Sequence, residues 1–252
     1  MRAGSDVTVV ERVLRILDTF GTSDPGLSLT EISRLASLPL SSTHRLLGQL
    51  ADWGAVERDE ASRYRIGLRL WEIAARAHRN VGLREAALPY LEDLYEATHQ
   101  NVQLAVLDGT DAVYLERISG REAVHVVTRT GSRLPLHATG VGLVLLAYAA
   151  HAVRQQVFAG PLVRYTRYTI TDPAVLRRTL AAVRRDGYAM SDRQIEVVSL
   201  SVAAPVRAAN GDVVAAVSIV IPARTQAQRF VPAVLTTARG ISRAVSSAAA
   251  RP

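Results

Sequence analysis

The sequence contains no cysteine and no lysine, and its apolar residues never form a long uninterrupted run. Without cysteine, disulfide bonds and thiolate metal sites are excluded, which agrees with a reducing compartment. No apolar run reaches the roughly 18 residues that a membrane-spanning helix needs. The N-terminal stretch MRAGSDVTVVERVLRILDTF carries charges where a secretory signal would have its apolar core. We therefore expect a soluble cytoplasmic protein that does not bind membranes.

The charged residues are unevenly distributed along the chain. All 30 residues counted as Lys or Arg are arginine, and with 23 acidic residues they give a net charge of +7. Residues 1–82 hold 11 arginines and 10 acidic residues, whereas residues 83–252 hold 19 and 13. The nearly neutral N-terminal part is unfavourable for a protein that coats DNA without sequence preference. The length of 252 residues and the 48% hydrophobic content suffice for two domains with ordinary cores.

The N-terminal part has the pattern of a winged helix-turn-helix. Apolar residues at steps of three and four predict a helix from Val9 to Phe20, ending at about Gly21. A short helix follows, with four apolar residues on one face: Leu29, Ile32, Leu35 and Ala36. The turn SLPL then leads into the helix SSTHRLLGQLADW, and two short helices joined by a tight turn are typical of a helix-turn-helix. The segment AVERDEASRYRIG predicts a β-hairpin, or wing.

The second helix of this motif begins with hydroxyl side chains. The leucines that follow Thr43 at helical spacing predict a buried stripe, with the hydroxyls turned outward. Ser41 or Ser42 is expected to cap the helix, and Arg45 to reach a phosphate or a guanine edge. The side chains predicted to contact DNA are Ser41, Ser42, Thr43, Arg45 and Gln49 of the helix and Arg58, Arg63 and Arg65 of the hairpin. The alternative is that the serines only cap the helix and the arginines form a solvated face.

The rest of the chain predicts an α+β domain. The stretch after the hairpin has a long helical pattern, interrupted at Gly82 and bent at Pro89. NVQLAVLDGTDAVYLERI predicts two strands around a turn, AVHVVTRTG predicts a third, and VVSLSVAAPV and VVAAVSIVIP predict two more around an NGD turn. Helices are expected at residues 141–150, 172–185 and 230–249. We predict a winged helix-turn-helix in residues 1–67, a linker helix in 68–82 and the α+β domain in 83–252.

Enzymatic motifs are missing or incomplete. GVGLVL around Gly140 lacks the third glycine of a dinucleotide-binding loop, and GxSxG, P-loop and HExxH motifs are absent. The six histidines lack metal-ligand spacing, and His137 is expected to be a buried structural histidine. We therefore expect no catalytic residue, no metal and no cofactor. The alternatives are an enzyme with an appended DNA-binding module and a protein that binds DNA non-specifically.

Six blocks follow one another along nearly the whole chain: LSLTEISRLASLPLSSTHRLLGQLADWGAVERD, RYRIGLRLWEIA, VYLERISG, RTGSRLPLHATGVGLVLLA, TITDPAVLRRTLAAVRRDGYAMSD and VAAPVRAANGDVVAAVSIVIP. This succession resembles the isocitrate lyase regulator (IclR) family of bacterial transcription factors. The chain departs from the family pattern at Leu40 and Leu143, where the family has a basic residue and a lysine.

The resemblance implies a ligand-responsive transcriptional regulator with a GAF-like effector-binding fold in its second domain. It also implies that the first helix and the linker helix pair two chains, so we expect a homodimer or a tetramer on a palindromic operator in double-stranded DNA. The alternative for the linker segment is a helix that packs on its own sheet.

The helix that begins after Thr139 is the predicted effector site. Free amides at a helix N-terminus favour an anion such as a carboxylate. The resemblance implies that the pocket is lined by Ala138, Thr139, Gly140, Val141, Ser191, Asp192, Ser201 and Ser218. Small polar groups on apolar strands suit a small organic or aromatic acid as effector. The alternative is that Ser201 and Ser218 simply bond neighbouring backbone.

Overall fold

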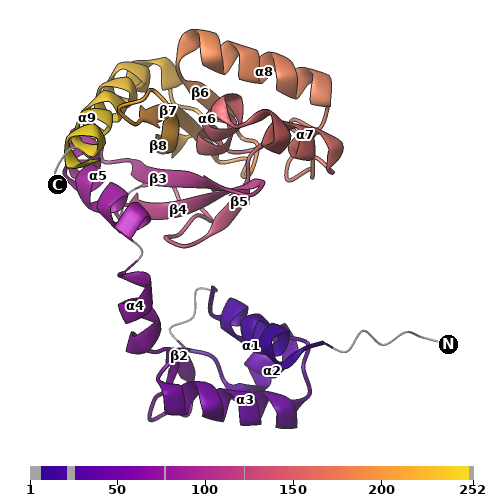
Figure 1. Ribbon diagram of the computed structural model, residues 1–252. Coiled ribbons are helices and arrows are strands. Elements are labelled where there is room, and N and C mark those ends of the chain that lie inside the picture. Colours follow the sequence, from indigo (N-terminus) through magenta and orange to yellow (C-terminus); the bar gives the residue numbers. More distant parts are fainter. Residues whose placement is uncertain (1–6, 22–25, 77, 122, 250–252) are drawn as a thin grey trace. The chain divides into compact units, whose positions relative to one another are not determined.

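The computed structural model describes residues 7–21, 26–76, 78–121 and 123–249 (Figure 1). The chain divides into two compact units, Met1–His78 and Arg79–Pro252. The boundary between them falls inside the predicted linker, residues 68–82. Among the described residues, no helix is both long and apolar enough to span a bilayer.

The N-terminal unit is a small helical unit with a two-stranded hairpin. Its elements are α1 (Val9–Asp18), η1 (Thr19–Gly21), α2 (Leu29–Leu35), α3 (Leu40–Trp53), β1 (Val56–Arg58), β2 (Tyr64–Ile66) and α4 (Leu68–Ala74). Ile16, Ile32 and Leu47 are fully buried in its core, so α1, α2 and α3 share one apolar centre. Ser28 and Glu31 form a reciprocal capping box at the start of α2.

The start of α3 differs from the sequence prediction. Pro39 is the residue before the first turn and no side chain caps the helix, so the expected cap by Ser41 or Ser42 is wrong. Thr43 is fully buried, and its hydroxyl donates to the carbonyl oxygen of Pro39 at 3.0 Å. Because α3 begins at Leu40, Thr43 lies one turn before the buried leucines and belongs to their stripe. The prediction that Thr43 faces outward, toward DNA, is therefore wrong.

The helical segment between the hairpin and the first long strand is divided differently from the prediction. It forms α4 and then α5 (His78–Thr98), which runs through Gly82 and contains Pro89. A glycine inside a helix costs only about 1 kcal/mol. In α5 the apolar side chains of Leu83, Leu91 and Leu94 pack into the core of the C-terminal unit and compensate for that cost. The predicted interruption at Gly82 is wrong.

The C-terminal unit is built on a six-stranded antiparallel sheet with the order β5-β4-β3-β8-β7-β6. The strands are β3 (Asn101–Asp108), β4 (Asp111–Ile118), β5 (Arg133–Pro135), β6 (Ala189–Asp192), β7 (Ser199–Arg207) and β8 (Val213–Pro222). The remaining elements are α6 (Gly140–Tyr148), α7 (His151–Ala159), α8 (Pro173–Asp186), η2 (Ala227–Phe230) and α9 (Val231–Ala249). The α+β prediction is confirmed.

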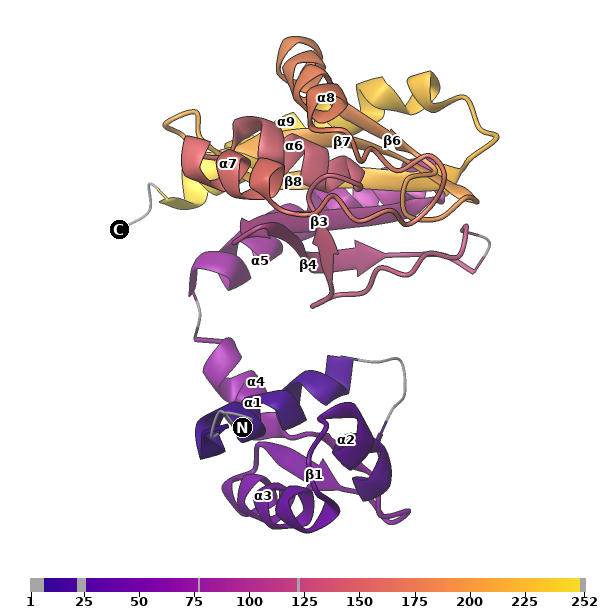
Figure 2. The ribbon, with the colours of Figure 1, turned by 90° about the vertical axis from the view of Figure 1, so that its right-hand side faces the viewer.

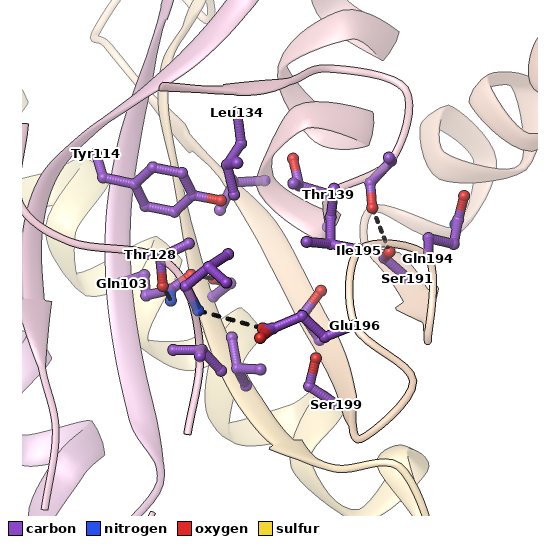
Figure 3. A pocket seen from close by; sticks show the side chains of 18 residues that line it. Gln103, Tyr114, Thr128, Leu134, Thr139, Ser191, Gln194, Ile195, Glu196 and Ser199 are labelled. Atoms are coloured by element: carbon purple, nitrogen blue, oxygen red, sulfur yellow. Dashed lines mark hydrogen bonds between the residues drawn. The ribbon is translucent and has the colours of Figure 1, made fainter. Parts of the chain in front are cut away.

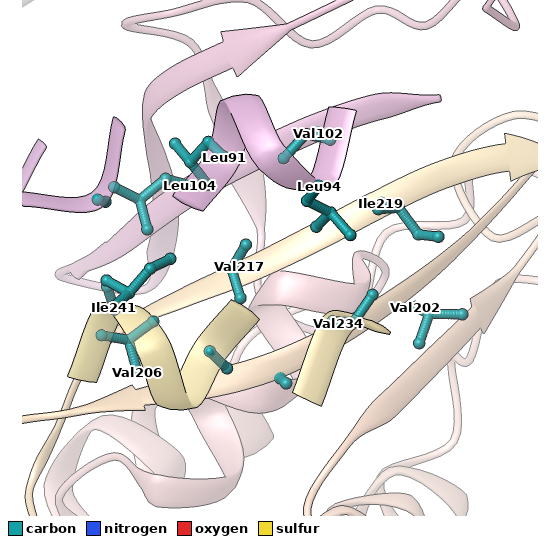
Figure 4. Close-up of a cluster of buried hydrophobic side chains, with 14 of the residues drawn as sticks. Leu91, Leu94, Val102, Leu104, Val202, Val206, Val217, Ile219, Val234 and Ile241 are labelled. Atoms are coloured by element: carbon teal, nitrogen blue, oxygen red, sulfur yellow. The ribbon is translucent and has the colours of Figure 1, made fainter. Parts of the chain in front are cut away.

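Helices cover both faces of this sheet (Figures 1 and 2). On one face, α5 and α9 pack against larger side chains such as Leu104 and Val217 (Figure 4). On the other face, α6 packs where the strands present alanines, which are Ala105, Ala203 and Ala216, and α8 packs against α6. Small side chains allow a helix to approach the strands closely. The N-terminus of α6 therefore lies directly against the sheet.

The third strand predicted at residues 123–131 is absent, and the strand that pairs with β4 is instead β5. Side chains bond the backbone of the predicted segment. The carbonyl of Val124 accepts from the Asn101 amide at 2.8 Å, and the carbonyl of Thr128 accepts from Arg117 at 3.0 Å. These bonds replace some of the backbone hydrogen bonds that the segment would make if it were a strand in the sheet. The segment forms a wall over one end of the sheet.

Candidate functional site

The exposed face of α3 carries part of the predicted DNA-binding set. Ser41, Arg45 and Gln49 are exposed at four-residue spacing, so they share one side of the helix, whereas Ser42 is half-buried. Arg45 makes no ion pair with any residue that the structure describes. A free guanidinium on an exposed helix face is available for a phosphate or a base edge.

The arginines of the hairpin have partners within the N-terminal unit. Arg63 lies 3.3 Å from a carboxylate oxygen of Glu31. Arg65 lies 2.6 Å from Asp59, and its hydrogen bond lowers the pKa of that carboxyl group. The guanidinium of Arg58 lies 5.6 Å from the centre of the Tyr64 ring. The carboxylates neutralise part of the charge of Arg63 and Arg65, whereas Arg58 keeps its full charge on the hairpin.

The C-terminal unit contains a pocket between the start of α6, the sheet and the segments before β5 and β7 (Figure 3). Seven of the eight predicted effector-binding residues line it: Ala138, Thr139, Gly140, Val141, Ser191, Ser201 and Ser218. The sequence prediction missed further polar lining residues: Gln103, Tyr114, Thr128, Gln194, Glu196 and Ser199. An apolar lining with a few convergent polar groups is typical of a small-molecule site.

The N-terminus of α6 forms one end of this pocket. Thr139 caps the helix by accepting from the Gly142 amide at 3.0 Å. The amides of Gly140 and Val141 have no acceptor within the described part of the chain. A Cβ on Gly140 would lie 2.5 Å from the hydroxyl of Ser201 on β7, so only glycine permits this approach. The two free N–H groups and the helix dipole together favour an anionic group here.

Hydrogen bonds hold most of the polar lining in place. Ser191 donates to the carbonyl of Ala138 at 2.8 Å. The amide of Gln103 donates to Thr128 at 2.5 Å and accepts from Ser218 at 3.4 Å. Ser218 thus bonds a side chain, so the alternative that it bonds neighbouring backbone is wrong.

Two hydroxyl groups of the lining differ in how they are bonded. The Tyr114 phenol lies deep in the unit, where burial raises its pKa and where it is hydrogen-bonded to Thr139. The hydroxyl of Ser201 has no hydrogen-bond partner among the described residues. Since Ser201 faces the free amides of α6, it is available to a ligand held there.

Asp192 does not line the pocket, so its prediction as an effector-binding residue is corrected. Its carboxylate pairs with the guanidinium of Arg193 at 2.7 Å. Successive side chains of a strand point to opposite faces, and on β6 Ser191 points into the pocket. Asp192 must therefore point away from it.

His137 is buried beside the pocket but is not part of its lining. Its Nε2 atom lies 3.0 Å from the carbonyl oxygen of Val163, and burial lowers the pKa of the imidazole. The prediction of a buried structural histidine is confirmed. Across the ranges that the structure describes, no three His, Asp or Glu side chains gather in a way that would hold a metal ion.

A helix-turn-helix in one unit and a small-molecule pocket in the other define the class of ligand-binding transcription factors. Residues 9–60 match the model of the IclR helix-turn-helix domain, and residues 75–246 match that of the bacterial transcriptional regulator IclR C-terminal domain. The chain therefore belongs to the IclR family of bacterial transcriptional regulators.

Relatives of this chain match it over most of their length and most of its own. The chain is 35% identical to the regulator XynR of Escherichia coli (strain K12) over 212 residues, 83% of this chain and 84% of XynR. It is 31% identical to the regulator KdgR of the same organism, over 94% of this chain and 92% of KdgR. An IclR homolog from Microbacterium hydrocarbonoxydans, solved in complex with 4-hydroxybenzoate, is 38% identical with a TM-score of 0.88 and covers 95% of this chain and 100% of its own.

Proposed function

We propose that the protein is a cytoplasmic regulator that binds a palindromic operator as a homodimer or a homotetramer, and that a small aromatic or other organic acid controls this binding. The main support for an acidic effector is the pocket, which has the free amides of Gly140 and Val141 at one end. Control requires that the effector bind one arrangement of the protein more tightly than another.

On DNA, α3 acts as the recognition helix. Arg45, Gln49 and Ser41 contact the major groove or its flanking phosphates from the exposed face of the helix. Arg58, Arg63 and Arg65 contact the backbone from the hairpin, the last two after partial release from their carboxylates. Ser42, half-buried, contributes less than Ser41.

Dimer formation is supported by apolar side chains that the N-terminal unit leaves exposed. On α1, Val10 and Leu14 are 68% and 54% exposed, and on α4, Leu68 and Trp71 are 62% and 65% exposed. Large apolar side chains clustered on a surface mark interaction sites. A second copy of the same chain would cover them and produce a two-fold symmetric pair of recognition helices, which requires a palindromic operator.

The effector binds with its carboxylate at the N-terminus of α6, next to Thr139 and Ser201. Two findings support an acid: the partial positive charge of the free amides, and the 4-hydroxybenzoate bound to the Microbacterium homolog. The protein acts as a regulator and not as an enzyme, in line with the names of its curated relatives. Among the lining residues of the pocket, no histidine stands beside a hydroxyl group as a general base would.

The test of this function is selection of bound sequences from random duplex DNA by the intact protein, at about physiological salt so that non-specific binding is suppressed. Enrichment of a palindrome is the expected result. The selected duplex is then titrated with and without benzoate and 4-hydroxybenzoate, and at least one acid should change its affinity. Enrichment of no sequence, with or without the acids, would overturn the proposal. Binding that unrelated DNA competes away equally would indicate a non-specific DNA-binding protein.

A further inference from the structure

The pocket contains one feature that a site for an acid would not be expected to have. Its lining includes the carboxylate of Glu196 and no arginine or histidine. Glu196 lies in the segment between β6 and β7, and one of its oxygens accepts from the Val127 amide at 3.3 Å. Within the described ranges, Glu196 forms no ion pair. A negative charge therefore faces the space in which an acidic ligand would lie.

One arginine interacts with this carboxylate but forms no ion pair with it. Arg117 is close enough to interact with Glu196 electrostatically. Its guanidinium, however, donates to the carbonyl of Thr128 at 3.0 Å and to the side chain of Asn101 at 2.9 Å. Arg117 is thus engaged in holding the 123–131 segment in place. Glu196 remains the charged group in the lining of the pocket.

The two ends of the pocket have opposite polarity. Free amides and the helix dipole make the α6 end positive. In Figure 3, Glu196 reaches from its own segment toward the wall formed by residues 126–128, while Thr139 lies beside α6. A ligand with a single carboxylate would be attracted to the α6 end and repelled from the other. An acidic ligand should therefore lie with its carboxylate at the α6 end and its other end toward Glu196.

An ionised carboxylate is an acceptor with room for about four hydrogen bonds. Glu196 receives one such bond from the described residues, at 3.3 Å, and water must supply the others. A ligand that displaces this water without offering a donor leaves the carboxylate desolvated, which is costly. A ligand with a hydroxyl group at that end replaces the water with a charge-assisted hydrogen bond.

We infer that Glu196 determines effector specificity by selecting acids that carry a hydroxyl group at the end opposite their carboxylate. The inference rests on the proposed function, because it concerns the same effector site. The ligand carboxylate binds at Gly140 and Val141, and its hydroxyl donates to the free oxygen of Glu196. A hydrogen bond to a charged group changes affinity by about tenfold to a hundredfold. Acids that lack the hydroxyl should bind correspondingly more weakly.

Isothermal titration of the intact protein with three probes tests the inference: benzoate, 3-hydroxybenzoate and 4-hydroxybenzoate. At least one hydroxybenzoate should bind the wild-type protein tenfold or more tightly than benzoate. Glu196→Gln keeps the size and a neutral acceptor, so benzoate should bind better and the preference should shrink. Glu196→Ala should reduce the preference to less than about threefold. The control is Asp192→Asn, which removes a neighbouring carboxylate outside the pocket and should keep the wild-type preference.

Two results would overturn the inference. One is that wild type binds benzoate as tightly as both hydroxybenzoates. The other is that the preference survives unchanged in both Glu196 variants. In either case acids still bind, and the proposed effector site stands. If none of the three acids binds the wild-type protein, the acid effector of the proposed function is itself wrong, and the role of Glu196 fails with it.

Discussion

An alanine at position 140 would place a methyl group between the start of α6 and β7. Its Cβ would lie 2.5 Å from the hydroxyl oxygen and 3.3 Å from the Cβ of Ser201, while Ala203 lies at an ordinary 3.4 Å. The first distance is well inside van der Waals contact, so the helix or the strand must shift. Overpacking of this kind costs about 1–3 kcal/mol. Alanine also removes conformational freedom from the unfolded chain, which returns about 0.4–1 kcal/mol.

Gly140→Ala should therefore lower the free energy of unfolding of the C-terminal unit by about 1–2 kcal/mol. Ser201→Gly removes both close atoms, so the double variant should recover most of that loss in a double-mutant cycle. Gly82→Ala is the matched control, since a Cβ there meets nothing within 4 Å and should not destabilise α5. A stable Gly140→Ala variant, or a loss that Ser201→Gly does not relieve, would refute the close approach of α6.

The assay can separate the two units. Both tryptophans, Trp53 and Trp71, lie in the N-terminal unit, and the sequence has only these two. Tryptophan fluorescence during urea unfolding therefore follows the N-terminal unit, whereas circular dichroism follows both. The fluorescence midpoint should not move in Gly140→Ala. The loss of stability should appear only in the circular dichroism signal.

Three further predictions concern other parts of the molecule. Arg45→Ala should weaken operator binding by about tenfold or more. The control is Arg178→Ala, which replaces an exposed arginine on α8 and should leave operator binding unchanged. Equal operator affinities of the two variants would exclude Arg45 as a contact. Ser28→Ala removes the capping box and should cost the N-terminal unit about 1 kcal/mol, seen as a lower urea midpoint in tryptophan fluorescence; an unchanged midpoint would show that the cap contributes nothing. Because burial lowers the pKa of His137, the native state takes up this proton less readily than the unfolded state, and stability should fall as the pH drops below the ordinary value of 6.5. His137→Gln, which can still bond the Val163 carbonyl, should flatten this slope between about pH 7.5 and pH 5.5; thermal unfolding checks it, and parallel slopes would contradict the assignment.

Periodicity predicted the elements whose apolar residues repeat strongly. The helix-turn-helix, the hairpin and the NGD-turn strands are of this kind. It misplaced Thr43, because a short polar side chain that bonds its own backbone can occupy a buried helix position. It also predicted a strand at 123–131, where alternating residues do occur. Partners such as Asn101 and Arg117, which bond that backbone, lie on other strands and cannot be found from local sequence.

The pocket was predictable only in part, for a similar reason. The helix start at Thr139 has a local signature, and the residues on β6, β7 and β8 were inferred through family resemblance. Gln103 was detectable as an amide side chain flanked by apolar residues in a buried strand. Glu196 and Thr128 lie in irregular segments far apart in the sequence, and only the folded chain brings them to one cavity. Asp192 was misassigned because strand alternation depends on a register that its neighbours alone do not fix.

The strand order of the C-terminal unit has a consequence for biosynthesis. Its central pair joins β3 to β8, with Asn101 opposite Val220, so the middle of the sheet cannot form until nearly the whole chain has been translated. The helices and hairpin of the N-terminal unit need only residues up to about the end of α4, and domains fold as units while the chain emerges. The helix-turn-helix is thus complete on the ribosome well before the pocket exists. A chain released before β8 would carry a folded helix-turn-helix without the pocket of the C-terminal unit.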